Sequence, residues 1–374
     1  MSRIVISGYY GFGNAGDEAL LASIVDSLRD HDSEIEITVI SGNPLETARK
    51  HNVHAVGTFS AFGILKALAS CDLLISGGGS LLQDATSIRN VYYYLAIMSL
   101  AKMLGKKVAL YAQGIGPLRR PTTRKAVKWV LNRMNIITVR DVLSKELLEE
   151  IGVASDKVHV TADSVLSMHR DDLSKGESIL QGYGIRPGCQ RIGISVRSWK
   201  ESIAYRKPLA KALTDMQLHH DVDIIFIPMS HPDDTREAKG IVQEMNFFLP
   251  KGGEGRKGKV VLLEDSFSTG ELLELSGSVD IMIGVRLHAL IFASLMGKPV
   301  IGISYDPKIG NFLHMINQEC IGTVDELDSQ LLHQRLNTLL QSTASYEESF
   351  ARIRKLQEAS MRSATLALSL LHTK

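Results

Sequence analysis

Cysteine is scarce in this sequence: Cys71, Cys189 and Cys320 are scattered along 374 residues without a CxxC pair. An odd number of isolated cysteines argues against a disulfide framework and a structural zinc site, and it suits a reducing compartment. Long hydrophobic runs are lacking too, because no stretch reaches the roughly 20 apolar residues that a membrane-spanning helix needs. Glycines break the first apolar run from Gly8 onward, which is too early for a secretory signal. We therefore expect a cytoplasmic protein.

Several catalytic signatures are also missing. There is no HExxH, no Cys/His cluster and no DxD-like pair at a strand end, so we expect neither a metal ion nor a cofactor. The absence of a GxSxG elbow and of a Walker-type glycine loop disfavours serine hydrolases and nucleoside triphosphate hydrolysis. The first glycine-rich turn lacks the GxGxxG spacing of dinucleotide-binding proteins, which disfavours that class.

Acidic residues are missing from one long stretch, between Asp84 and Asp141. The whole chain has a formal net charge of only +1, so the asymmetry is local. The eleven basic residues of this stretch are Arg89, Lys102, Lys106, Lys107, Arg119, Arg120, Arg124, Lys125, Lys128, Arg133 and Arg140. Two interpretations stay open: a surface that meets anions, such as phosphates, nucleic acid or an anionic membrane face, or a solvated face balanced by acidic residues elsewhere.

Short apolar runs alternate with longer amphipathic segments along most of the chain. Apolar residues make up 44% and charged residues 22%, which is typical of a globular protein, and the length allows two domains. Continuous Val/Ile/Leu runs, such as 107–112 and 299–304, predict strands buried on both faces, as in parallel sheets covered by helices. The pattern therefore predicts an α/β fold with two Rossmann-like parallel-sheet domains facing a cleft.

The polar stretch 167–190, which is rich in charge and contains Gly and Pro, is the expected domain junction. The predicted domains are residues 1–170 and 188–320, followed by C-terminal helices over 321–374. The basic loop 251–259 is either a lid or a surface insertion. Ligands of open α/β sheets bind beyond the carboxyl ends of the strands, so the search for a site narrows to the residues after each strand.

In the first half, three predicted strands end in glycine-rich turns: 8-GYYGFGNAGDEALL-21, 76-SGGGSLLQD-84 and 111-YAQGIGP-117. Glycines let a ligand approach the backbone, and a following helix offers unpaired N–H groups. The candidates for contacts with a hydroxyl-rich ligand are Asn14, Asp17, Gly78, Gly79, Asp84 and Gln113. The alternative is a structural role, with Asp17 as a helix cap and Asp84 as a cap or loop contact.

In the second half, charged residues follow the strands instead. Arg197 ends one predicted strand, Arg286 and His288 follow another, and Lys308 follows a third. Arginine has a rigid fork that matches carboxylate or phosphate, and lysine supplies a point charge. Singly, Arg197 could pair with a carboxylate and His288 could cap a helix. Together, with few acidic residues to neutralise them, they predict a site for a small molecule that carries several negative charges.

The six motifs GYYGFGNAGDEALL, SGGGSLLQD, YAQGIGP, SVR, GVRLHALIFASLMGKP and VIGISYDPK occur in this order over about residues 3–315. In this combination the chain resembles the polysaccharide pyruvyl transferases, in particular the CsaB type that acts in making secondary cell-wall polymers. The resemblance implies a GT-B-like architecture, phosphoenolpyruvate as donor, a pair of sugar hydroxyls as acceptor and a pyruvate ketal as product. Residues 286–288 match the Arg–Leu–His element of the family.

For the CsaB type, the resemblance implies a lipid-diphosphate-linked acceptor that contains N-acetylmannosamine, with the ketal across its 4- and 6-hydroxyls. The pyruvylated polymer would anchor surface-layer proteins. The enzyme would work in the cytoplasm at the inner, anionic face of the membrane, with no nucleic acid as partner. The six residues of the first half would then bind the acceptor.

Phosphoenolpyruvate carries a carboxylate and a phosphate, so its site needs several fixed cations. The predicted donor-binding residues are Arg197, Arg286, Lys308 and Ser304, and the predicted catalytic residues are His288 and Arg286. An imidazole can donate a proton near neutral pH, so His288 can act as the acid that protonates C3 of the donor. Two other interpretations remain: a nucleotide-sugar glycosyltransferase of GT-B architecture, and a non-enzymatic polysaccharide-binding protein.

Overall fold

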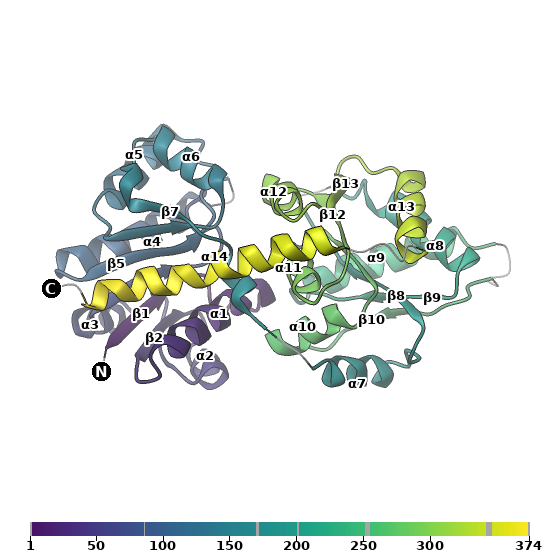
Figure 1. Ribbon diagram of the computed structural model, residues 1–374, viewed down its shortest axis with the longest axis horizontal. Coiled ribbons are helices and arrows are strands. Elements are labelled where there is room, and N and C mark those ends of the chain that lie inside the picture. Colours follow the sequence, from purple (N-terminus) through teal and green to yellow (C-terminus); the bar gives the residue numbers. More distant parts are fainter. Residues whose placement is uncertain are drawn as a thin grey trace. The chain divides into compact units, whose positions relative to one another are not determined.

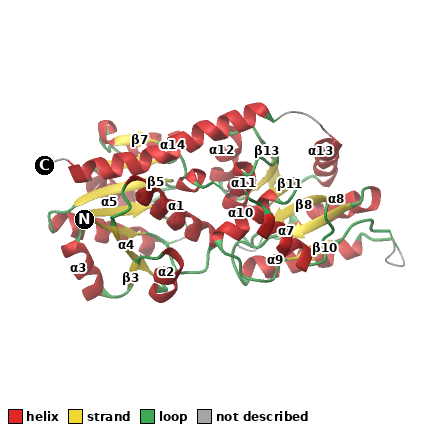
Figure 2. Cartoon of the chain, turned by 60° about the horizontal axis from the view of Figure 1, so that its bottom comes forward, coloured by secondary structure: helices red, strands yellow, loops and turns green. Residues whose placement is uncertain are grey.

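The computed structural model describes residues 2–85, 87–169, 172–199, 202–250, 255–341 and 346–372. The chain divides into two compact units: unit 1 comprises Met1–Met168 and Lys355–Lys374, and unit 2 comprises His169–Arg354 (Figure 1). Each unit contains one parallel β-sheet with helices packed around it (Figure 2). The predicted α/β class with two Rossmann-like domains is thereby confirmed.

Unit 1 has a seven-stranded sheet in the order β3-β2-β1-β4-β5-β6-β7. Its strands are β1 Arg3–Ser7, β2 Glu36–Ser41, β3 His54–Gly57, β4 Leu73–Gly77, β5 Lys107–Gln113, β6 Ile136–Val139 and β7 Val158–Val160. Its helices are α1 Ala15–His31, α2 Pro44–His51, α3 Ala61–Ser70, α4 Ile88–Met103, α5 Pro121–Leu131 and α6 Val142–Glu150. The reversal of strand order between β1 and β4 places the ends of these two strands at a topological switch point.

Alternate residues of the unit 1 strands face opposite helix layers. Val5, Leu74 and Val108 belong to the same buried cluster as Ile64 of α3 and Met98 of α4. Residues of α5 and α6 also join this cluster, so α3, α4, α5 and α6 cover one face of the sheet. This alternation follows from the two-residue period of a strand.

Unit 2 has a six-stranded sheet in the order β10-β9-β8-β11-β12-β13. Its strands are β8 Gln190–Ser195, β9 Val222–Phe226, β10 Val260–Leu262, β11 Ile281–Gly284, β12 Val300–Ser304 and β13 Glu319–Thr323. Its helices are α7 Ser174–Gly182, α8 Arg206–His219, α9 Asp233–Phe247, α10 Thr269–Gly277, α11 Leu287–Leu295, α12 Pro307–Met315 and α13 Ser329–Gln341. The three strands that precede the predicted donor residues, β8, β11 and β12, are therefore contiguous.

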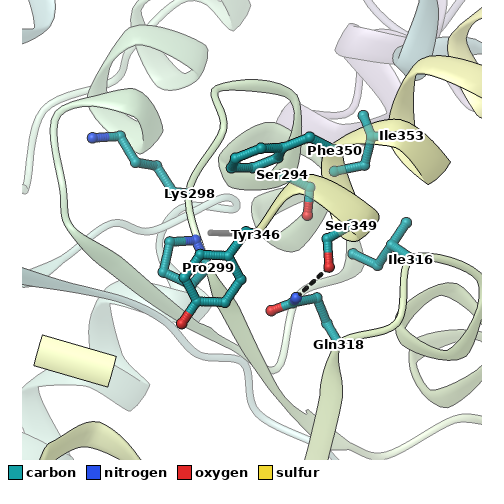
Figure 3. A pocket seen from close by; sticks show the side chains of 9 residues that line it. All are labelled: Ser294, Lys298, Pro299, Ile316, Gln318, Tyr346, Ser349, Phe350 and Ile353. Carbon is teal, nitrogen blue, oxygen red and sulfur yellow. Dashed lines mark hydrogen bonds between the residues drawn. The ribbon is translucent and has the colours of Figure 1, made fainter. Parts of the chain in front are cut away.

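The C-terminal region differs from the expected tail of helices over 321–374. Strand β13 reaches Thr323, and helix α13 packs against α8 within unit 2. The last helix, α14 (Glu347–His372), starts in unit 2, where Ser349 accepts a hydrogen bond from Gln318 (2.7 Å; Figure 3). From Lys355 onward the same helix belongs to unit 1, where Ser360 donates to the carbonyl of Asp163 (3.0 Å).

The first four residues of the predicted lid or insertion, 251–254, lie outside the described residues. Among the residues that are described, no helix combines the length and apolarity needed to cross a bilayer.

Candidate active site

The carboxyl ends of neighbouring strands in unit 2 bring the predicted donor residues together. Arg197 lies two residues after β8, and Arg286 lies two residues after β11. The turn after β11 is tight, because a Cβ atom on Gly284 would lie only 2.7 Å from the side chain of Leu290. Glycine thus lets α11 start immediately, with Arg286 at its N-cap and His288 half-buried in its first turn.

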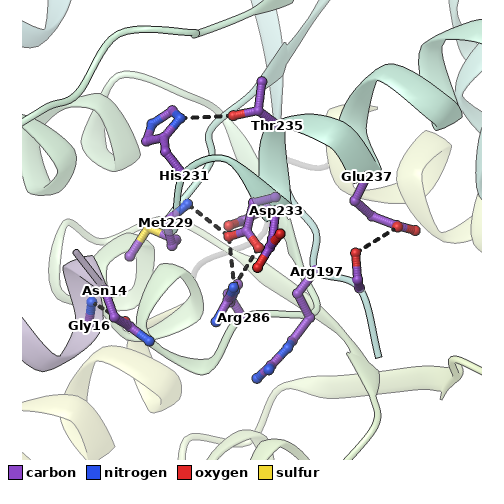
Figure 4. A network of polar contacts seen from close by, with 12 residues as sticks. Asn14, Gly16, Arg197, Met229, His231, Asp233, Thr235, Glu237 and Arg286 are labelled. Carbon is purple, nitrogen blue, oxygen red and sulfur yellow. Dashed lines mark hydrogen bonds and ion pairs between the residues drawn. The ribbon is translucent and has the colours of Figure 1, made fainter. Parts of the chain in front are cut away.

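Arg286 is held by a buried carboxylate that the sequence analysis did not assign. Its Nε donates to Oδ2 of Asp234 (2.9 Å) and its Nη2 donates to Oδ1, so the pair is bidentate (Figure 4). Asp234 is fully buried in α9 and also accepts from the backbone N–H of Met229. Burial raises the pKa of Asp234, although the charge and hydrogen bonds of Arg286 oppose this shift. The pair fixes the orientation of the guanidinium.

Arg197 and Lys308 lie around the ring of Tyr305, which directly follows β12. Arg197 Nη1 donates to the Tyr305 hydroxyl (2.6 Å), and its guanidinium lies 4.5 Å from the ring centroid. Lys308 Nζ lies 5.1 Å from the same centroid. The backbone N–H of Lys308 donates to Asp306, which caps α12. The tyrosine therefore links two of the three predicted donor cations.

The expectation that few acidic residues neutralise these cations was wrong. Asp234 pairs with Arg286, and Asp306 Oδ2 lies 4.0 Å from Lys308 Nζ. Three cations against two carboxylates leave the cluster with a single net positive charge when the histidines are neutral. Ser304, also predicted to bind the donor, donates its hydroxyl to the carbonyl of Asp306 (3.0 Å).

A second buried carboxylate supports the loop that carries Arg197. Glu237 accepts two hydrogen bonds from Arg206 (2.6 and 2.7 Å), one from Tyr205 and one from Ser198. Burial alone would raise the pKa of Glu237, but these donors, Arg206 foremost, lower it below its ordinary value. Tyr205 also donates to the carbonyl of Arg197 (3.1 Å), so the network positions the backbone of the arginine.

Two histidines lie near these strand ends in unit 2. His288 is the second residue of α11. His231 follows β9, and its Nδ1 lies 2.8 Å from the Thr235 hydroxyl (Figure 4). Imidazole can donate a proton near neutral pH, which makes both residues chemically suited to acid catalysis.

In unit 1, Asn14 rather than Asp17 is the N-cap of α1. Its side-chain oxygen accepts from the backbone N–H groups of Gly16 (2.9 Å) and Asp17 (3.4 Å). The same turn presents an exposed, stacked pair of aromatic rings, Tyr9 and Phe12, with centroids 4.4 Å apart. Burial, and then the charge of Asp17, raise the pKa of Tyr9. Both residues stand in the first glycine-rich motif, but the sequence there did not predict that their rings would stack.

The glycines after β4 fit closely against α1. Gly78 and Gly79 have φ values of +63° and +71°, and a Cβ atom on Gly78 would lie 3.0 Å from Leu20. The predicted close approach of the backbone is thus made to a helix of the same unit. Gln113, at the end of β5, is buried and donates to both the carbonyl and the hydroxyl of Ser76. Its Oε1 has no hydrogen-bond partner among the described residues.

Asp84 holds a loop, which was the structural alternative at this position. Its carboxylate accepts from the backbone N–H groups of Arg119 (2.7 Å) and Arg120 (2.9 Å). Burial would raise its pKa, but these bonds lower it. Arg140 does not belong to the outer basic surface, because it is buried against Asp163 (3.1 Å) beyond β6. Asp84 and Arg140 therefore both help to hold loops in place at the carboxyl edge of the sheet.

Groups of three or more His, Cys, Asp or Glu residues that could hold a metal ion do not occur within the described parts of the chain.

Solved structures with the same fold include two sugar-nucleotide proteins. A UDP-GlcNAc 2-epimerase from Neisseria meningitidis, bound to UDP-GlcNAc, is 14% identical, with a TM-score of 0.65 over 100% of both chains. HepE from Anabaena, in complex with UDP and glucose, is 13% identical, with a TM-score of 0.63 over 100% of this chain and 98% of HepE. Identities this low show the fold alone, and they confirm the GT-B-like fold with two Rossmann-like domains.

Sequence comparisons point to a function. The amylovoran biosynthesis protein AmsJ of Erwinia amylovora is 22% identical over 404 aligned positions, which cover 94% of this chain and 95% of AmsJ. The model of the polysaccharide pyruvyl transferase family matches residues 14–307, which is most of the chain. The chain belongs to the polysaccharide pyruvyl transferase family, and it is therefore a transferase.

Proposed function

We propose that this transferase takes pyruvate from phosphoenolpyruvate and that the donor binds at the strand ends of unit 2. The observation that carries this proposal is the cluster of Arg197, Arg286 and Lys308 beyond three adjacent strands. Asp234 orients Arg286, while Tyr305 orients Arg197. Oriented cations of this kind suit an anion with two separate charged groups, a carboxylate and a phosphate.

The chemistry needs one acid and a stabilised leaving group. Protonation of C3 of phosphoenolpyruvate makes C2 electrophilic, and one sugar hydroxyl adds to it. The C2–O bond to phosphate then breaks, and the second hydroxyl closes the ketal. The two hydroxyl protons balance the proton gained by C3 and the proton carried away by inorganic phosphate. We assign the acid to His288, and the cations stabilise the phosphate as it leaves.

We assign the acceptor to unit 1. The exposed Tyr9–Phe12 pair offers an apolar platform of the kind on which sugar rings pack, and Asp17 lies on the adjoining first turn of α1. Gly78 and Gly79 follow β4, and Gln113 is the last residue of the neighbouring strand β5. Asn14 and Asp84 would act indirectly, by capping α1 and by holding the loop before α5.

We further propose the acceptor that the resemblance implies: N-acetylmannosamine in a lipid-diphosphate-linked cell-wall polymer precursor, ketalised across its 4- and 6-hydroxyls. The reaction would take place in the cytoplasm at the inner membrane face, and the polymer would serve to anchor surface-layer proteins. Support for this part comes from the six motifs and their order along the chain.

The test is turnover with phosphoenolpyruvate and a synthetic lipid-diphosphate acceptor that contains N-acetylmannosamine. We expect release of inorganic phosphate, a product heavier by one ketal-linked pyruvyl group, and the same rate in EDTA. Arg197→Gln should weaken the apparent affinity for the donor, whereas Lys207→Gln, which removes an exposed cation elsewhere in unit 2, should not. Transfer from a nucleotide sugar, with none from phosphoenolpyruvate, would show that the glycosyltransferase interpretation was correct.

A further inference from the structure

The outer surface of helices α3, α4 and α5 in unit 1 is almost free of negative charge. Between Thr58 and Arg140 the sequence has twelve basic residues and two acidic ones, Asp72 and Asp84. Asp72 precedes β4 and accepts from the backbone N–H of Arg3, and Asp84 is buried under the loop before α5. Neither of these acidic residues belongs to α3, α4 or α5. We call this outer side, with Phe59 at its start, the α3–α5 surface.

Each part of the α3–α5 surface also exposes large apolar side chains. Phe59 and Phe62, at the start of α3, are 91% and 80% exposed. Met103 ends α4 and is 83% exposed, and Trp129 of α5 is 55% exposed. Thr58 accepts a hydrogen bond from Tyr93 of α4, and α4 packs against α5, so these side chains belong to one continuous layer. Met103 and Trp129 line the same hollow, and exposed apolar residues that gather in this way mark an interaction site.

A hollow of about 370 Å³ lies between α4 and α5. Met103, Trp129 and Met134 contribute its apolar lining, while Lys102 and Arg133 lie at its polar edge. The guanidinium of Arg133 lies 3.9 Å from the centre of the Trp129 ring, so an aromatic ring and a cation are presented together. Burial, and then the charge of Lys157, lower the pKa of Lys102, which agrees with a locally positive potential.

Not all eleven basic residues of the acid-free stretch contribute to this potential. Arg140 is buried, and Arg124 pairs with Glu150 of α6 (2.6 Å). The exposed cations that remain are Arg89, Arg119, Arg120, Lys125, Lys128 and Arg133. Lys125 and Lys128 share a face of α5 with Trp129, because residues three and four positions apart are neighbours on a helix.

We propose that the α3–α5 surface docks on an anionic lipid bilayer, with its cations on the headgroups and Met103 and Trp129 in the interfacial region. Basic residues beside exposed Trp, Phe and Met side chains are typical of surfaces that lie on membranes. A second copy of the chain would bring two acid-free surfaces together, and the charges would repel each other. Nucleic acid offers phosphates but no apolar layer for these side chains. The inference does not depend on the donor or on the acceptor sugar.

A vesicle flotation assay tests this proposal, because it measures membrane binding and requires no enzymatic turnover. The full-length protein should bind vesicles of phosphatidylcholine and phosphatidylglycerol in equal amounts, and it should bind pure phosphatidylcholine much less. Added salt should weaken the binding, since it screens exposed charges. Arg120→Gln/Lys125→Gln/Lys128→Gln should reduce the partition coefficient by roughly 100-fold, since each surface cation contributes about fivefold.

Matched control variants show whether binding depends on the α3–α5 surface in particular, rather than on exposed cations or apolar residues anywhere in the protein. Lys207→Gln/Lys239→Gln/Lys355→Gln removes three exposed cations elsewhere and should bind as the wild type does. Trp129→Ala should weaken binding, whereas Phe247→Ala, at a residue of α9 that is 82% exposed, should not. Circular dichroism would confirm that each variant is folded. Equal losses for both triple variants, equal binding to neutral and anionic vesicles, or binding only to oligonucleotides or to a second copy would overturn the proposal.

Discussion

Arg286 and His288 are two residues apart, but their substitution should affect donor binding and turnover in different ways. Arg286 pairs with the buried carboxylate of Asp234 and supplies charge to the donor site. His288 is the proposed acid. We expect His288→Ala to bind phosphoenolpyruvate nearly as the wild type does but to lower kcat by roughly 10²–10⁴, the usual loss for a general acid. Arg286→Ala should weaken donor binding as well as turnover. Steady-state kinetics with a separate binding measurement distinguish the two.

The control for this prediction is His288→Gln, which keeps a hydrogen-bonding side chain but cannot deliver a proton at neutral pH. If this variant turns over at nearly the wild-type rate, His288 has only a positioning or helix-capping role. His231 then becomes the candidate acid. His231 is also on a strand-end loop of unit 2, with Nδ1 close to the Thr235 hydroxyl.

Which residues pair at the site could not be predicted from the sequence. The basic residues at the strand ends of unit 2 were visible there, because parallel strands bring their carboxyl ends to one edge. Asp234 was visible too, in the segment 229-MSHPDD-234, but it lies 52 residues before Arg286, and no local pattern joins them. In unit 1, Asn14 and Asp84 looked like ligand residues, whereas their oxygens accept from backbone N–H groups nearby.

Helix α10 begins with a capping box whose glutamate should make stability depend on pH. Glu271 accepts from the backbone N–H and the hydroxyl of Ser268, and Lys175 of α7 lies 2.8 Å away. The hydrogen bond from Lys175 is the main reason why the pKa of Glu271 falls to about 2. A lowered pKa stabilises the fold above the unfolded value of 4.5, and this contribution is lost as the pH falls toward 2.

We expect Glu271→Gln to lower the free energy of unfolding at neutral pH by roughly 0.5–1 kcal/mol, a modest loss because Lys175 is largely exposed. The difference from the wild type should shrink as the pH falls from 4.5 toward 2, since the wild-type glutamate then becomes neutral as well. Urea unfolding at a series of pH values measures this. Glu358→Gln, at an exposed position of α14, is the control and should show no such trend. A constant difference at all pH values would contradict the assignment.

The strongly apolar strands were the part of the fold that the sequence predicted best. The apolar runs 107–112 and 299–304 predicted β5 and β12 nearly to the residue, since both faces of these strands are buried. Strand β13 was missed because its residues are mostly part-exposed and resemble a loop. Helix α7 was missed because it lies in the polar stretch that was interpreted as a junction.

The return of α14 to unit 1 could not be inferred from the sequence, because helical periodicity says nothing about which core a helix joins. Ala364 and Ala367 are buried, and Ser363 donates to Thr161 (2.8 Å), so this part of the helix packs on the first unit. The chain thus passes between the units twice, after Met168 and after Arg354. Each unit retains its own buried cluster.

Because each unit has its own core, the proposed division of donor and acceptor can be tested in the whole protein by hydrogen–deuterium exchange. Phosphoenolpyruvate alone should slow exchange of the strand-end segments of unit 2: 196–199, 228–235, 285–289 and 305–309. At a donor concentration about 100 times the Kd, local opening that disrupts the site should be roughly 100-fold rarer. The glycine-rich turn 8–14 of unit 1 should exchange as before. Arg286→Ala should abolish the protection, and protection confined to unit 1 would instead place the donor there.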